Sequence, residues 1–172
     1  MNLTMIIILY IEDTNYSLKE PIQYETNNGR RLGNNLYLNL EQASLTDGYV
    51  SSVSFRLFTN WEGTASLYLF VLWRYLTLYE ILHRYAIKPQ RNTTQWQTLK
   101  IPSRTLPIDV GNTLAVGMQD SSDTNQIYIV KSGFTVWGSH ITENLTKPSV
   151  QGISDFGIAV SYSVVQYSKS VV

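Results

Sequence analysis

The aromatic side chains are the residues of this sequence best suited to binding chemistry. Twelve tyrosines accompany four tryptophans, which are Trp61, Trp73, Trp96 and Trp137. A flat apolar ring with a polar edge stacks on the C–H faces of sugars, and it equally fills cores and protein interfaces. Trp61 stands between Asn60 and Glu62 in a predicted loop. We therefore expect Trp61, Asn60 and Glu62 either to bind a carbohydrate or to cap the end of the fold.

The other three tryptophans lie in or near predicted strands. Trp73 stands within an apolar run, so we expect it in the hydrophobic core. Trp96 and Trp137 come near strand ends, where either a binding role or a packing role fits.

A polar loop over residues 120–125 brings several oxygen ligands close together in sequence. Asp120, Asp123 and Asn125 suit hydrogen bonding to sugar hydroxyls, and Asp120 and Asp123 are candidate ligands for calcium. Calcium takes about six to eight oxygen ligands, and this loop lacks the spacing, central glycine and closing glutamate of an EF-hand. A solvated hairpin turn explains the same residues, so the sequence requires no cofactor.

Motifs for catalysis are scarce. The chain has no cysteine and two histidines, His83 and His140, which no spacing brings together. It contains no G-x-S-x-G, H-E-x-x-H, Walker or G-x-G-x-x-G motif. A glycosidase needs two carboxylates in one cleft, and no spacing selects a pair from Glu62, Glu80, Asp109 and Asp120. We therefore expect a protein that is not an enzyme.

Four N-x-[ST] sequons begin at Asn2, Asn15, Asn92 and Asn144. Asn92 and Asn144 fall in predicted loops, as glycosylation requires, and they are the candidate glycosylation sites. An unmodified polar turn is the alternative at each position.

Composition limits the classes of partner. The 172 residues include 13 Lys+Arg and 13 Asp+Glu, so the formal net charge is +0. Nucleic-acid binders usually carry a basic excess, so we expect no nucleic-acid partner. Charged residues make up 15% and hydrophobic residues 44% of the chain, which favours a packed core and a single domain. The strongest internal apolar run, residues 64–73, is shorter than the roughly 20 residues of a membrane span.

Strand patterns recur between turn-forming residues. Apolar and polar side chains alternate over residues 36–41, 52–57 and 156–164, as in strands buried on one face. Asn, Gly and Pro predict turns between them, for example at Asn27-Asn28-Gly29. Many short strands with almost no helix predict an all-β, antiparallel β-sandwich, and the uneven connections favour a jelly roll.

Two segments allow alternatives. Residues 65–88 alternate as two strands, about 65–74 and 79–88, joined near Leu76-Thr77, but residues 74–86 also fit a helical stripe. The apolar residues 5–11 predict a strand or the remnant of a signal sequence. Residues 1–34 are then an N-terminal extension or an added strand.

Four segments resemble a known group of modules. They read DGYVSSVSF at 47–55, LFVLWR at 69–74, YEILHRY at 79–85 and IDVGNTLAVG at 108–117. Their order resembles the extracellular jelly-roll modules of secreted invertebrate proteins, which are similar to galactose-binding-like β-sandwiches. The resemblance spans residues 45–167, with Asn112 where those modules have Asp. It implies a secreted, extracellular recognition module.

We therefore expect a non-enzymatic extracellular module that binds carbohydrate through loop aromatics and Asp or Asn side chains. The alternative is a self-assembling jelly roll of the trimer-forming type. Residues 67–79 are apolar on both faces, and a partner surface would explain that excess. The expected partner is accordingly a glycan, a protein or further copies of this chain.

Overall fold

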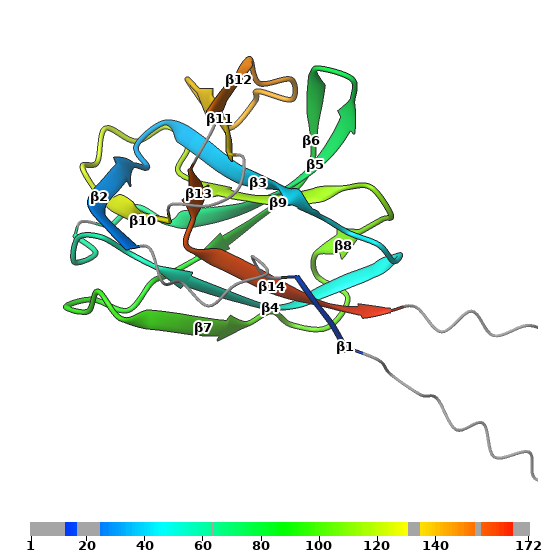
Figure 1. The fold of residues 1–172 in the computed structure, drawn as a ribbon, viewed down its shortest axis with the longest axis horizontal. Coiled ribbons are helices and arrows are strands. Elements are labelled where there is room, and N and C mark those ends of the chain that lie inside the picture. The colour runs from blue at the N-terminus through cyan, green and yellow to red at the C-terminus, as the bar shows by residue number, and fades with distance from the viewer. Residues whose placement is uncertain (1–12, 17–24, 63, 131–134, 154–155, 167–172) are drawn as a thin grey trace, which may run out of the picture.

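The computed structural model describes residues 13–16, 25–62, 64–130, 135–153 and 156–166. Within them the chain is all-β, and the strands pair antiparallel, which confirms the predicted class. Figure 1 shows two main layers of strands, one above the other. None of the described residues forms a helix long and apolar enough to cross a membrane.

The first layer is a five-stranded sheet. Its strands, in order, are β1 (Asp13–Tyr16), β14 (Val160–Gln166), β4 (Gly48–Arg56) and β7 (Trp96–Lys100), with β8 (Pro107–Ile108) also paired to β4. A smaller sheet of β13 (Gly157–Ile158), β10 (Gln126–Val130) and β2 (Glu25–Arg31) adjoins it. An isolated bridge between Leu57 and Ile127 links β10 to the end of β4.

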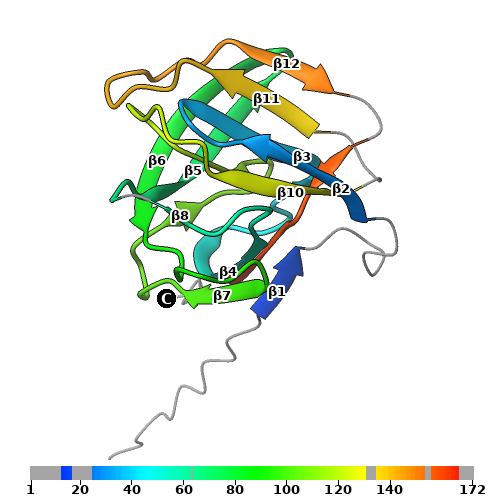
Figure 2. The same cartoon turned by 90° about the vertical axis from the view of Figure 1, so that its left-hand side faces the viewer.

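The second layer is a six-stranded sheet. Its order is β12 (Val150–Ile153), β11 (Thr135–Ser139), β3 (Asn35–Ala43), β9 (Thr113–Gly117), β5 (Leu67–Tyr75) and β6 (Leu78–Ile87). The predicted pair of strands at 65–88 is confirmed, with Tyr75 paired to Leu78 across a two-residue turn. The sheet curves so that β12 and β6, its two edges, lie toward the same side of the molecule (Figure 2).

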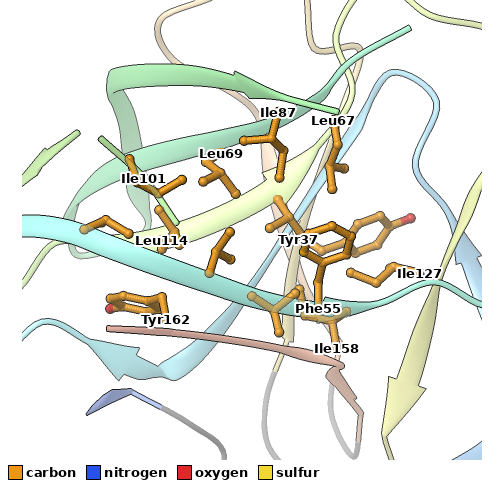
Figure 3. Close-up of a cluster of buried hydrophobic side chains, with 14 of the residues drawn as sticks. Tyr37, Phe55, Leu67, Leu69, Ile87, Ile101, Leu114, Ile127, Ile158 and Tyr162 are labelled. Atoms are coloured by element: carbon orange, nitrogen blue, oxygen red, sulfur yellow. The ribbon is translucent and has the colours of Figure 1, made fainter. Parts of the chain in front are cut away.

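The main core lies between the layers. Phe55 and Tyr162 from the first sheet face Leu69 and Leu114 from the second, and Ile127 closes one end (Figure 3). The alternation of apolar residues along β4 and β14 places these side chains on the inner faces.

The outer face of the six-stranded sheet is also buried, and within the described residues the cover comes from this chain itself. Leu36, Leu38, Phe70 and Leu72 form a second apolar cluster there, together with Ile141 from the connection between β11 and β12. This connection, residues 140–149, covers the sheet, so β3 and β9 are buried on both faces. The expectation of one wet face is wrong for residues 36–41 of β3, because the chain folds back over the outer face of this strand.

A polar brace ties the two layers together. The buried side chain of Asn39 on β3 accepts a hydrogen bond from the backbone N of Ile158 (2.9 Å) and donates one to its carbonyl oxygen (3.1 Å). Gln42 donates to the carbonyl of Val160 (3.1 Å), and the hydroxyl of Tyr162 donates to the carbonyl of Gln42. Buried polar groups cost free energy unless they are paired, and here each bond joins different strands.

Two expectations near the N-terminus have clear outcomes. The predicted turn at Asn27-Asn28-Gly29 is wrong, because these residues form the middle of β2. Gly29 is required there by close packing: a Cβ would lie 2.6 Å from atoms of Phe58. Strands β1 and β2 within residues 1–34 are added strands that pair with β14 and β10. Residues 5–11 lie outside the described residues, and the jelly-roll connectivity stays a prediction.

Candidate functional site

The structure places Trp61 in the main core rather than on a loop surface. Its side chain is 4% exposed and packs with the buried residues between the sheets. Trp61 lines a small pocket of about 130 Å³, but an indole this buried offers too little surface to stack on a sugar ring. The placement favours the alternative interpretation, in which Trp61 closes the end of the sandwich, while its neighbours Asn60 and Glu62 are exposed.

Asn125 meets the Trp61 loop, but through a structural contact. Its side-chain carbonyl accepts a hydrogen bond from the backbone N of Glu62 (2.9 Å), and its amide donates to the backbone O of Glu62 (3.0 Å). Asn125 is buried. Both of its polar atoms are therefore occupied in joining two loops.

The remaining residues of the 120–125 loop are also held by the protein. A carboxylate oxygen of Asp120 accepts from the backbone N of Glu143 (2.8 Å), and Arg31 donates to the carbonyl of Asp123 (3.1 Å). Oδ2 of Asp123 is buried without a hydrogen-bond partner. In the described part of the chain, no group of three or more His, Cys, Asp or Glu side chains is placed to hold a metal ion. The structure therefore offers no support for calcium at Asp120 and Asp123.

A different site emerges from the hairpin of β5 and β6. Leu69 and Val71 face the main core, and alternation puts Trp73 and Tyr75 on the same face farther along β5. Trp73 is nevertheless 44% exposed and Tyr75 is 58% exposed. The expectation that Trp73 lies in the core is wrong because the hairpin continues beyond the part of the sheet that the first layer covers. Figure 1 shows its turn at the top of the molecule.

The two exposed aromatic rings lie nearly parallel. Their centroids are 5.9 Å apart and their planes differ by 10°. Directly opposite residues of an antiparallel pair share a face. Glu80 pairs with Trp73, and Leu78 pairs with Tyr75. The exposed hairpin face thus carries two aromatic rings, one aliphatic side chain and one carboxylate.

A groove lies beside this hairpin. It encloses about 450 Å³ between the hairpin and residues 147–150, which precede and begin β12. Its apolar lining comes from Trp73, Leu78, Tyr79, Pro148 and Val150, and its polar lining from Thr77, Glu80, Lys147 and Ser149. The volume lies within the roughly 300–1,000 Å³ range of small-ligand sites. Glu80 is the only carboxylate among these lining residues, so the groove does not hold the pair that a glycosidase requires.

Contacts from β6 hold the far wall of the groove. The backbone N of Ile81 donates to the carbonyl of Thr146 (2.8 Å). The guanidinium of Arg84 donates to the carbonyls of Thr142, Glu143 and Leu145. Burial lowers the pKa of Arg84, and the nearby carboxylates of Glu143 and Asp120 oppose that effect. Arg84 thereby fixes the connection that carries Lys147 and Pro148.

Tyr79 places a neutral phenol in the lining. Burial raises the pKa of Tyr79, while the charge of Arg74 opposes the change. Arg74 lies opposite Tyr79, with its guanidinium carbon 5.8 Å from the ring centroid. The hydroxyl therefore stays protonated at neutral pH and can donate or accept a hydrogen bond.

The sequence contained one local pattern that could have indicated this site, although the overall composition did not reveal it. The segment Trp73-Arg74-Tyr75-Leu76-Thr77-Leu78 places large apolar residues on both sides of a predicted turn, where polar residues are usual. Large apolar residues around an exposed turn are typical of a surface that binds another molecule. Residues 147–150, which form the opposite wall of the groove, carried no such signal in the sequence. They are far from the hairpin in sequence, and only the fold brings them beside it.

Fold and site together define an all-β sandwich with a groove beside a protruding hairpin. No protein-family model matches the chain, and no curated protein and no solved structure shows significant similarity to it.

Proposed function

We propose that this chain is a non-enzymatic extracellular recognition module that binds a carbohydrate in the hairpin groove. The parallel, half-exposed pair of Trp73 and Tyr75 is the observation that carries the proposal, since Trp73 lines the groove and Tyr75 extends the aromatic surface beside it. Aromatic faces exposed to water are costly unless a ligand covers them, and the C–H faces of pyranose rings are a suitable cover. The resemblance of residues 45–167 to secreted carbohydrate-binding sandwiches points the same way.

Polar groups in the groove suit the rest of a sugar. Thr77, Glu80, Lys147 and Ser149 supply hydroxyl, carboxylate and ammonium groups around an apolar floor. A sugar ring needs this combination, since its hydroxyl groups must exchange hydrogen bonds with water for bonds with protein. Glu80 accepts from hydroxyl groups and Lys147 donates to them.

The direct test is a glycan array followed by calorimetry with the oligosaccharides that bind. We expect W73A and Y75A each to weaken binding by tenfold or more, since stacking on an aromatic ring is lost. W96A is the matched control, because Trp96 is 41% exposed on β7 of the other sheet. An array without hits, or equal losses in W73A and W96A, would refute binding at this groove.

Self-association is the rival use of the same apolar face. Sedimentation of the wild-type protein at high concentration distinguishes self-association from carbohydrate binding. A monomeric mass excludes self-association, whereas an oligomer that W73A dissociates supports it.

Extracellular location is part of the proposal and has its own test. Asn92 and Asn144 are both exposed, and Asn92 lies in a turn with a φ of 57°. Expression through a eukaryotic secretory pathway should yield a mass that falls after N-glycosidase treatment, and N92Q and N144Q should each remove one glycan. A mass that enzyme treatment leaves unchanged would contradict glycosylation at both positions.

A further inference from the structure

The turn of the β5–β6 hairpin exposes aliphatic side chains to water. Leu76 is 74% exposed and Leu78 is 67% exposed, beside the half-exposed Trp73 and Tyr75. Neither leucine is part of either buried cluster. Packing among the described residues does not explain their hydrophobicity, which points to a surface that covers them.

The backbone of the turn adds a second, independent observation. Leu76 has a φ of 56°, in the left-handed region, whereas Thr77 does not. A two-residue hairpin loop with positive φ at its first residue favours glycine there, and a bulky residue in that region is strained. Leucine at this position serves neither local stability nor solubility. Strain of this kind points to a function of the side chain.

The part of the hairpin nearest the turn carries no charge. Leu76 and Thr77 form the turn, and Tyr75 and Leu78 form the first rung. Charged side chains begin at the second rung, where Arg74 pairs with Tyr79, and continue at the third, where Trp73 pairs with Glu80. Nε of Arg74 donates to the carbonyl of Leu76 (3.0 Å), and Lys147 lines the groove. A bilayer presents the matching order with depth: hydrocarbon, then the zone that Trp and Tyr prefer, then phosphate groups that attract cations.

The dimensions agree with that order. Leu76 is three residue steps from Trp73, which is about 10 Å at the strand rise of about 3.3 Å per residue. Apolar faces of interfacial segments enter the headgroup boundary by about 5–10 Å. The exposed hairpin therefore has the length of an interfacial anchor.

We infer that the hairpin turn inserts into the outer layer of a lipid bilayer, so that the glycan in the groove is one carried by a membrane lipid. This inference rests on the proposed carbohydrate function for the glycan and on Leu76, Tyr75 and Leu78 for the lipid. The groove opens beside the turn, since Leu78 and Thr77 belong to its lining. A headgroup sugar at the bilayer surface is thus placed at the height of Trp73 and Glu80.

A lipid surface fits these residues better than a protein partner does. Stable protein interfaces bury about 800 Å² and roughly 20–30 residues on each partner, whereas the exposed apolar residues of the hairpin end are Trp73, Tyr75, Leu76 and Leu78. The turn also has nearly balanced charge, with Arg74 and Lys147 against Glu80. We therefore expect binding to neutral bilayers and little dependence on salt.

Vesicle flotation with the full chain tests the inference. The probes are phosphatidylcholine vesicles alone and phosphatidylcholine vesicles that contain a mixed glycosphingolipid fraction. We expect wild-type protein to bind both and to bind the second more tightly.

L76N should weaken binding about tenfold or more, since burial of one leucine is worth roughly that factor. Asparagine tolerates the left-handed φ, so this variant keeps the turn. L45N is the matched control, because Leu45 is 80% exposed in the loop between β3 and β4.

The outcomes separate this inference from the proposed function. Soluble oligosaccharide binding that L76N retains, combined with lost vesicle binding, supports both. Oligosaccharide binding without any vesicle binding overturns the inference and leaves the function. Vesicle binding that L76N abolishes, without any glycan hit, supports insertion and refutes the carbohydrate. Equal vesicle binding by wild type and L76N, or a wild-type oligomer that L76N dissociates without lipid, overturns insertion.

Brominated lipids add a measure of depth. Bromine near the headgroup should quench the fluorescence of wild-type protein more than that of W73F, because Trp73 then lies within the interface. W96F should be quenched as strongly as wild type. Equal quenching of W73F and wild type overturns the insertion geometry.

Discussion

Asn125 illustrates how a polar loop residue can serve structure instead of ligand binding. Its buried amide exchanges two hydrogen bonds with the backbone of Glu62. We expect N125A to lower the free energy of unfolding by about 1–3 kcal/mol, because the loops lose both bonds and a buried site is left unfilled. N60A changes an exposed neighbour and should alter stability by less than about 0.5 kcal/mol. Urea denaturation measures both. Unchanged stability in N125A would contradict the structural role.

Tyr37 gives the fold a dependence on alkaline pH. Burial raises the pKa of Tyr37 from 10.0 to about 12, against a smaller opposing effect of Arg30. The unfolded chain therefore ionises first as pH rises above 10. Tyr37 stabilises the fold fully below pH 10, and on the order of 2–3 kcal/mol is lost as pH approaches 12.

The variant Y37F removes this titration. It also loses the bond from the hydroxyl to the carbonyl of Arg31 (2.9 Å), so we expect a cost of about 1 kcal/mol at pH 8 and a shallower decline of stability toward pH 12. Y75F, at a half-exposed position, is the control that should keep the wild-type decline. Parallel pH profiles for Y37F and wild type would contradict this assignment.

At the scale of elements, Arg84 connects β6 to the segment that covers the second core. Its planar fork reaches the carbonyls of Thr142, Glu143 and Leu145. Lysine keeps the charge but offers a single donor group. We expect R84K to lower the free energy of unfolding by about 1–3 kcal/mol and to weaken ligand binding in the groove, since Lys147 loses its support.

Thermal unfolding and calorimetric titration measure the two effects of R84K separately. R104K changes an exposed arginine and is the matched control, for which neither quantity should change. Normal stability together with normal binding in R84K would show that the clamp is dispensable.

The elements themselves were largely readable from the sequence, whereas their exposure was not. Alternation and turn residues predicted β4, β5, β6 and their boundaries, because period and turn chemistry are local properties. The sequence wrongly predicted a core position for Trp73, and it left Trp61 open between binding and capping, for one common reason. Exposure depends on where the facing sheet ends and which loop folds back, and neither is encoded near the residue. The role of Gly29 was likewise not readable from its neighbours in sequence. A glycine is needed there because Phe58, which is distant in sequence, packs against its backbone.

At the scale of the whole molecule, one part of the excess of apolar residues is buried within the fold, and another part stays exposed at the β5–β6 hairpin. Residues 67–79 are apolar on both faces, and the sequence alone suggested a partner for the second face. The connection at 140–149 covers most of that face through Ile141 and Leu145. Within residues 67–79, the apolar side chains that stay exposed are Trp73, Tyr75, Leu76 and Leu78 at the end of the hairpin, so for this segment the search for a partner narrows to one surface.

The strand order makes the fold depend on its last described strand. β14 lies between β1 and β4 in the middle of the first sheet, and it contributes Val160, Tyr162 and Val164 to the main core. A chain that ends at Ala159 exposes the paired edge of β4 and loses these three side chains. Their loss costs about 6–15 kcal/mol, because each core truncation costs about 2–5 kcal/mol, and this is as large as the roughly 5–15 kcal/mol that stabilises a domain. We expect the variant that ends at Ala159 to lack a cooperative thermal transition by near-ultraviolet circular dichroism.

A variant that ends at Gln166 is the control, because it keeps every described strand and should unfold cooperatively. A cooperative transition in the shorter chain would show that the two sheets are not one folding unit.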